Sequence, residues 1–325
     1  MESSAPFAKP ALQFFLDSLQ TGTPNDSILL IYIFLIALCT SLTILVFLMS
    51  TMNRVYHRNL KRLYQVGVLI WFVLIISKML VMATQRFYLG NLYSLAVAAF
   101  FRYFYVYFFT ASPLSIILER HLATFYLMDY EKRHRPWIFY TIFLSNLSIA
   151  TIFSCLIILQ LISIRVFALH ILSVLLLTVL LYWGLYWTNS KRLEFLEHRR
   201  IDTSRGDLFT YTLSTKYQLK ETLVTLRSMR SLLLVILIAI FLILLTSLLP
   251  ILLKLPLDPS ASIHIFTDIV YHFSPLYTSP ACLYFIPQNR ELIGARLGLQ
   301  KSSSPEHVIH NQVNAADVYF NMFHK

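Results

Sequence analysis

Residues 94–121 read SLAVAAFFRYFYVYFFTASPLSIILERH, a long apolar and aromatic stretch that ends with the ionisable residues Glu119 and Arg120. A helix of about 20 mostly apolar residues is long enough to cross the hydrocarbon core of a bilayer. Ionised side chains inside that core are costly unless they are paired. The stretch therefore predicts a transmembrane helix that carries a charged pair to one face of the membrane.

The composition of the whole chain agrees with this prediction. Of the 325 residues, 57% are hydrophobic and only 13% are charged, whereas soluble domains average about 45–50% apolar and about 25% charged residues. The three cysteines, Cys39, Cys155 and Cys282, all lie in apolar runs, so we expect no extracellular disulfide framework. The composition is that of an all-α membrane protein.

Seven apolar runs in the chain are long enough to span a bilayer. The sequence therefore predicts a seven-transmembrane helix bundle over residues 28–286, in which a tight hairpin joins the fourth and fifth spans. Residues 1–27 precede the bundle, and residues 287–325 follow it as a tail in which residues 288–301 fit a short amphipathic helix. The predicted spans cover residues 28–49, 64–83, 94–118, 137–161, 166–186, 231–253 and 263–286.

Positive charge is concentrated on alternate loops of this bundle. The first, third and fifth loops and the tail hold 21 of the 27 Lys and Arg residues, whereas the amino-terminal segment and the other loops hold four. Cytoplasmic loops carry such an excess, so we expect an extracellular amino-terminal segment and a cytoplasmic tail. The net charge of +11 then reflects membrane topology, and we expect no nucleic-acid partner.

This orientation places Glu119 and Arg120 at the cytoplasmic end of the third span. Adjacent residues on a helix point in different directions. We therefore expect each of the two side chains to find its partner elsewhere, on another helix or on a cytoplasmic protein. A pair that simply reaches water at the membrane interface is the alternative interpretation.

The long fifth loop carries a predicted helix with two distinct surfaces. Four basic residues lie within about 80° of one another at 100° per residue: Lys216, Lys220, Arg227 and Arg230. Three leucines form an adjacent apolar edge: Leu219, Leu223 and Leu226. Such an inward extension of the sixth helix would dock on membrane lipid headgroups or on an acidic partner protein. A basic stripe without a partner is the alternative.

Three charged residues lie inside predicted spans, all in the outer half of the membrane: Lys78, Arg102 and Asp268. Because an unpaired charge there is costly, we expect Asp268 to pair with Lys78 or Arg102 and to leave one cation over. Two interpretations remain open. The first is a salt bridge that locks the helices together, and the second is a ligand cavity that recognises an acidic or strongly hydrogen-bonding compound. The cavity would also include Phe101, Tyr105 and His272, and we expect no metal site or cofactor.

The seven spans and the triplet Glu119, Arg120 and His121 resemble G-protein-coupled receptors, whose third span ends in Asp or Glu, Arg and Tyr. More specifically, ERHLATFYLMDYE (119–131) and YTLSTKYQLKETL (211–223) resemble the paired signatures of nematode serpentine chemoreceptors. The resemblance is to the Sra superfamily, and most closely to its Sre class.

This resemblance implies a chemosensory receptor of the plasma membrane, including that of a sensory-neuron cilium, with a small-molecule ligand and a heterotrimeric G protein as partners. It also implies that Arg120 restrains the sixth helix in the inactive state and meets the G protein in the active state, with Glu119 as its modulator. The sequence departs from rhodopsin-like receptors at residues 280–284, where PACLY stands in place of the Asn-Pro-x-x-Tyr motif.

A membrane transporter or channel that uses the intramembrane charges is the main alternative function. The odd number of spans and the content of only seven glycines argue against it, because transporter folds commonly contain paired repeats and broken helices. The motifs HExxH and GxSxG do not occur, so we do not expect an enzyme.

Overall fold

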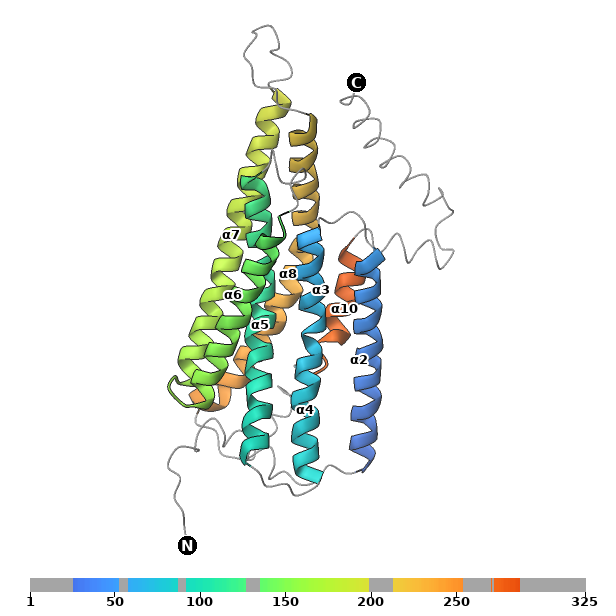
Figure 1. Cartoon of the computed structure of the whole chain (residues 1–325), viewed down its shortest axis with the longest axis vertical. Coiled ribbons are helices and arrows are strands. Elements are labelled where there is room, and N and C mark those ends of the chain that lie inside the picture. The colour runs from blue at the N-terminus through green and yellow to red at the C-terminus, as the bar shows by residue number, and fades with distance from the viewer. Residues whose placement is uncertain are drawn as a thin grey trace, which may run out of the picture.

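The computed structural model describes residues 26–52, 58–86, 92–126, 135–198, 213–253, 270 and 272–286, and the regular structure in these ranges is helical (Figure 1). Long apolar runs fold as helices because only a helix satisfies every backbone N–H and C=O within one lipid-exposed segment. The helices are α2 (Asp26–Met52), α3 (Arg58–Leu69), α4 (Trp71–Arg86), α5 (Leu92–Phe125), α6 (Pro136–Ile158), α7 (Ile164–His198), α8 (Leu213–Leu253) and α10 (Pro275–Phe285).

Six segments of the described ranges are long and apolar enough to cross a membrane. They correspond to the first six predicted spans, and α3 and α4 together form the second of them. Within that span the turn at Ile70 keeps the chain continuous, because the Ile70 N–H donates to the Val66 carbonyl at 2.9 Å. The seventh predicted span, residues 263–286, is described only at residue 270 and from residue 272 onward, where α10 lies. Residues 1–25 and 287–325 fall outside the described ranges.

The observed helices extend beyond the predicted spans at the end of the bundle that contains Glu119 and Arg120. α5 continues to Phe125, α7 continues to His198 and α8 begins at Leu213. The bilayer requires only that the apolar part of a helix be long enough to cross the hydrocarbon core. The helix itself can continue into polar sequence outside that core. The predicted helical extension of the sixth span is therefore present, since α8 runs without a break from the basic segment into the apolar one.

A tight hairpin connects α6 to α7, as the sequence predicts. Gln160 has a φ of 58°, and its N–H donates to the Ile157 carbonyl at 2.9 Å. The Leu161 N–H reaches back to the Leu156 carbonyl at 2.9 Å. Bonds of this kind close the last turn of a helix and reverse the chain.

α5 is the central helix of the bundle. It packs against α3, α4, α6, α7 and α8, and 67% of its apolar window is buried, compared with 17% to 41% for the other membrane-crossing segments. The aromatic stretch at residues 103–108 is buried throughout. Because α5 has neighbours on all sides, its polar residues are enclosed by protein. α10 completes the bundle by packing between α2 and α8 (Figure 1).

Candidate functional site

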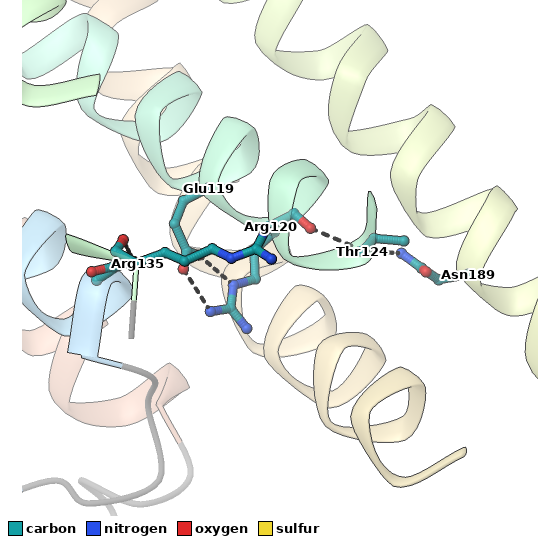
Figure 2. A network of polar contacts seen from close by, with 6 residues as sticks. Glu119, Arg120, Thr124, Arg135 and Asn189 are labelled. Carbon is teal, nitrogen blue, oxygen red and sulfur yellow. Dashed lines mark hydrogen bonds and ion pairs between the residues drawn. The ribbon is translucent and has the colours of Figure 1, made fainter. Parts of the chain in front are cut away.

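Glu119 and Arg120 form a buried ion pair at the end of α5. The Arg120 Nε donates to Glu119 Oε2 at 2.6 Å and its Nη2 donates to Glu119 Oε1 at 3.0 Å (Figure 2). Glu119 is 0% exposed and Arg120 is 4% exposed. The expectation that these adjacent side chains would not meet was therefore wrong. The long Arg120 side chain folds back, and its planar guanidinium matches both carboxylate oxygens.

Hydrogen bonds of two polar residues, Thr124 and Asn189, connect α7 to the end of α5 beside this pair. The Thr124 hydroxyl donates to the Arg120 backbone carbonyl at 2.9 Å. The Asn189 Nδ2, from α7, donates to Thr124 Oγ1 at 3.4 Å and to the Leu185 carbonyl at 3.0 Å. Asn189 is 0% exposed, so this link lies inside the helix bundle (Figure 2). The backbone that carries Arg120 is thus held from α7.

α3 and the start of α6 meet the same end of α5. Asn59, which is 1% exposed, donates its Nδ2 to the Arg135 backbone carbonyl at 3.0 Å. The Arg135 guanidinium lies over the Tyr126 ring at 4.0 Å, and Figure 2 shows the Arg135 side chain extending toward the Glu119–Arg120 pair. Our sequence analysis did not identify Asn59 or Asn189. Asparagines within or beside apolar runs are the signal that would have found them, because such side chains form hydrogen bonds between membrane helices.

α8 has the two surfaces that the sequence predicts. Its three leucines are buried, at 1%, 5% and 0% exposure: Leu219, Leu223 and Leu226. Leu226 packs in one cluster with Ile117 of α5 and Leu185 of α7. The basic residues Lys220, Arg227 and Arg230 are exposed, and we call them the basic face of α8. Lys216 lies within the helix, but its side chain is outside the described part of the structure.

The two predicted intramembrane cations, Lys78 and Arg102, lie on different helices. The Lys78 Nζ, on α4, lies 5.1 Å from the centre of the Tyr32 ring on α2. That ring in turn lies 5.5 Å from the ring of Phe273, the neighbour of His272. Arg102 on α5 is 8% exposed. Asp268 lies outside the described residues, so its pairing stays a prediction.

The other predicted pocket residues are also placed by the structure. The Tyr105 hydroxyl is 2.8 Å from Ser274 Oγ, which joins α5 to the segment before α10. His272 is 6% exposed, and its backbone carbonyl accepts a hydrogen bond from Trp71 Nε1 at 3.0 Å. Phe101 is half-buried and its ring lies 5.7 Å from that of Phe100. Tyr105 and His272 thus come close to one another through the 272–274 segment, whereas Phe101 packs on its own helix.

A cavity of about 100 Å³ lies next to Tyr105, on the side of the Glu119–Arg120 pair. Its lining residues on α5 run from Tyr105 to Ile117. Of the six predicted pocket residues, Tyr105 alone is among the described residues that line it. The sequence analysis did not identify this cavity, because a void depends on how several helices pack. In the described ranges, no three His, Cys, Asp or Glu side chains converge as metal ligands.

Sequence comparisons agree with this architecture. The profile of the Sre G protein-coupled chemoreceptor family matches residues 11–324. Serpentine receptor class epsilon-21 of Caenorhabditis elegans is 29% identical over 316 residues, which cover 92% of this chain and 84% of that protein. Serpentine receptor class epsilon-1 of the same species is 29% identical over 142 residues, or 43% of this chain and 38% of that protein. Because the family match spans nearly the whole chain, this protein belongs to the Sre family of G protein-coupled chemoreceptors.

Proposed function

We propose that this receptor detects a small-molecule cue in the outer half of its bundle and activates a heterotrimeric G protein through Glu119 and Arg120. Membership of the Sre family makes it a chemosensory receptor with ligand and G-protein partners in general. Its membrane-crossing helices make it a multi-pass membrane protein. The observation that carries the proposal is the buried Glu119–Arg120 pair at the end of the central helix.

In the proposed mechanism, Glu119 holds Arg120 inside the bundle in the resting state. A charged group that leaves such a pair must gain equivalent interactions, since an unpaired buried charge is strongly destabilising. When the helices around α5 separate, an acidic or carbonyl-rich surface of a G protein offers Arg120 such interactions. The cue favours the separated state only through its higher affinity for it. Converting a 1:99 population into 99:1 requires a difference of about 5.5 kcal/mol in binding free energy.

The proposed cue site is the group of residues singled out in the outer half: Lys78, Phe101, Arg102, Tyr105, Asp268 and His272. The supporting observation is that the ionisable residue Arg102 is buried within the bundle, because buried ionisable residues of membrane helices commonly mark functional sites. The hydrogen bond between Tyr105 and Ser274 joins α5 to the chain that leads into α10. A cue bound beside Tyr105 would therefore act on both helices.

Nucleotide exchange and transmembrane flux distinguish the receptor from a transporter or channel. The full chain is reconstituted in vesicles, with and without a heterotrimeric G protein, and a panel of volatile and water-soluble compounds is screened. We expect at least one compound to accelerate GTPγS binding to the G protein, with no flux of that compound or of monovalent ions. Flux without exchange would instead support the transporter or channel.

The proposed topology places residues 1–27 outside the cell and residues 287–325 in the cytoplasm. We expect a glycosylation acceptor inserted within residues 1–25 to be modified and the same acceptor within residues 301–325 to stay unmodified. Both insertions are made in an Asn25→Gln background, because Asn25 begins a natural Asn-Asp-Ser sequon. The readout is the mobility shift removed by endoglycosidase, and the reverse pattern would contradict the proposed orientation.

Surface biotinylation of neurons would test the proposed location in the plasma membrane of a sensory cilium.

The basic face of α8 is proposed to contact the G protein or the anionic lipid around it. Each exposed Lys or Arg near an anionic surface contributes about 1 kcal/mol. We therefore expect the triple substitution Lys220→Gln, Arg227→Gln and Arg230→Gln to reduce G-protein activation by about tenfold to a hundredfold at matched surface levels.

The matched control for this triple substitution is Lys191→Gln with Arg192→Gln, which removes exposed charge from α7. We expect this control to signal like the wild type. Equal loss in the two variants would show that charge in general, and not the basic face of α8, determines coupling.

A further inference from the structure

Among the described residues, the cavity beside Tyr105 shares only Tyr105 itself with the proposed cue site. Its α5 lining extends from Tyr105 to Ile117, which is about 18 Å along the helix axis at about 1.5 Å per residue. Gly67 on α3, Leu233 on α8 and Ser279 on α10 also line it. Lys78, Arg102 and His272 do not. The cavity therefore lies between the proposed cue site and the Glu119–Arg120 pair.

The volume of the cavity sets the size of a molecule that fits it. An engineered apolar cavity of about 150 Å³ stays dry and binds benzene. The cavity here measures about 100 Å³, which is of the same order, so a molecule of about six heavy atoms is a suitable probe for it. Its walls are mostly aliphatic and aromatic side chains, which favour an apolar body.

The lining excludes charged molecules. None of the described residues that line the cavity is Asp, Glu, Lys, Arg or His. An ion that entered would lose its hydration without gaining a counterion, at a cost far above that of a neutral molecule. The occupant is therefore neutral, in contrast to the acidic or strongly hydrogen-bonding compound expected beside Arg102.

Most hydroxyl groups of the lining already have partners. Tyr105 and Ser274 bond to one another, Tyr182 donates to the Leu226 carbonyl at 3.2 Å, and Tyr64 interacts with the Cys282 side chain. Thr43, Ser112 and Thr278 already donate to carbonyls of their own helices, at 2.8, 2.8 and 2.9 Å. Ser279 is 6% exposed, and its hydroxyl makes no hydrogen bond with the described residues. A buried donor of this kind gains a bond if the occupant carries an acceptor.

We infer that this cavity binds a second small molecule, neutral and mainly apolar, whose single acceptor oxygen receives a hydrogen bond from Ser279. Its apolar body packs against α3, α5 and α8. The bound molecule joins α5 to α10 on the inner side of the Tyr105–Ser274 bond. Binding at this site requires neither a cue nor a G protein, so it is measured on the receptor alone.

Two glycines provide a matched pair of variants. A Cβ added at Gly67 would meet Ser112 Oγ at 3.6 Å and Ser112 Cβ at 3.7 Å, which is ordinary contact, so Gly67→Ala places a methyl group in the cavity without a clash. A Cβ added at Gly184 would meet nothing within 4 Å. Both substitutions change helix propensity by the same amount, and Gly67→Ala alone changes the cavity.

The probe is cyclopentanone, with cyclopentane and cyclopentanecarboxylate as comparisons. Binding to the full-length receptor in nanodiscs is measured as the concentration-dependent shift in the thermal unfolding midpoint, at one lipid composition, so that partitioning into lipid is the same for all variants. We expect wild type and Gly184→Ala to bind cyclopentanone equally, and Gly67→Ala to bind it about tenfold more weakly. We expect no shift with the carboxylate. Identical shifts in the three proteins, or no shift in wild type, would overturn the inference.

A second variant tests the assigned hydrogen bond. Ser279→Ala removes the donor with little change in volume, so we expect cyclopentanone to bind about fivefold more weakly and cyclopentane to bind as in wild type. Unchanged cyclopentanone binding in Ser279→Ala would overturn the assignment of Ser279. Binding of the carboxylate as tight as that of the ketone would overturn the neutral class of occupant.

Discussion

Arg120→Ala is expected to lower cue-dependent G-protein activation by at least about 30-fold at matched surface levels. In the structure the guanidinium makes two short charge-assisted bonds to Glu119, and we propose that the G protein takes over these bonds in the active state. Truncating one partner of such a buried pair costs about 2–5 kcal/mol. The measurement is the dose response of a chimeric G-protein reporter to a compound that activates the wild type.

Arg192→Ala is the control for this experiment. Arg192 is an exposed arginine on α7, so its removal deletes the same side chain without disturbing the interior, and we expect a response within about twofold of wild type. A normal dose response from Arg120→Ala would remove Arg120 from the coupling role.

A double-mutant cycle on Glu119 and Arg120 is expected to show the largest effects on stability. Each single substitution, Glu119→Gln or Arg120→Gln, breaks the buried ion pair by removing one of its two charges and is expected to cost about 3–5 kcal/mol. The double variant removes both charges of the pair, so we expect it to lose less than the sum of the two, with a coupling energy of up to about 3 kcal/mol. The measurement is reversible unfolding in mixed micelles.

Lys191 and Glu194 provide the matched control cycle. Their side chains are 3.3 Å apart on α7 and are 59% and 58% exposed. Exposed pairs at this helical spacing couple by only about 0.3–0.5 kcal/mol. If the cycle at Glu119 and Arg120 gave a coupling as small as this, the buried pair would have no special role in holding the bundle.

The helical spans follow from sequence because the bilayer imposes one strong requirement, a long apolar run. The ends of the helices do not follow from it, since hydrogen bonding along α5, α7 and α8 continues into polar sequence. The two surfaces of α8 are the exception. There, the spacing of Leu219, Leu223 and Leu226 indicates the buried side well before the membrane begins.

The sequence predicted where the candidate site residues lie along the helices better than it predicted which side chains they contact. The location of Glu119 and Arg120 follows from topology, but their mutual pairing was missed because helical spacing describes where Cβ atoms point and ignores the reach of an arginine. Depth along a span grouped Tyr105 with Phe101 but gave no information on which neighbouring helix each one faces. The cavity beside Tyr105 was missed altogether. Gly67 and Ser279 line it only because α3, α5 and α10 pack together, and the sequence does not show that packing.

Cue-free nucleotide exchange by a reconstituted G protein is the decisive measurement for the proposed Glu119–Arg120 switch. Glu119→Gln keeps the shape of the side chain and removes the charge that holds the guanidinium. We predict that this variant raises basal exchange several-fold above wild type, whereas Glu119→Gln combined with Arg120→Gln shows none of this increase. Basal exchange by Glu119→Gln equal to that of wild type, at the same amount of folded receptor, would contradict the switch.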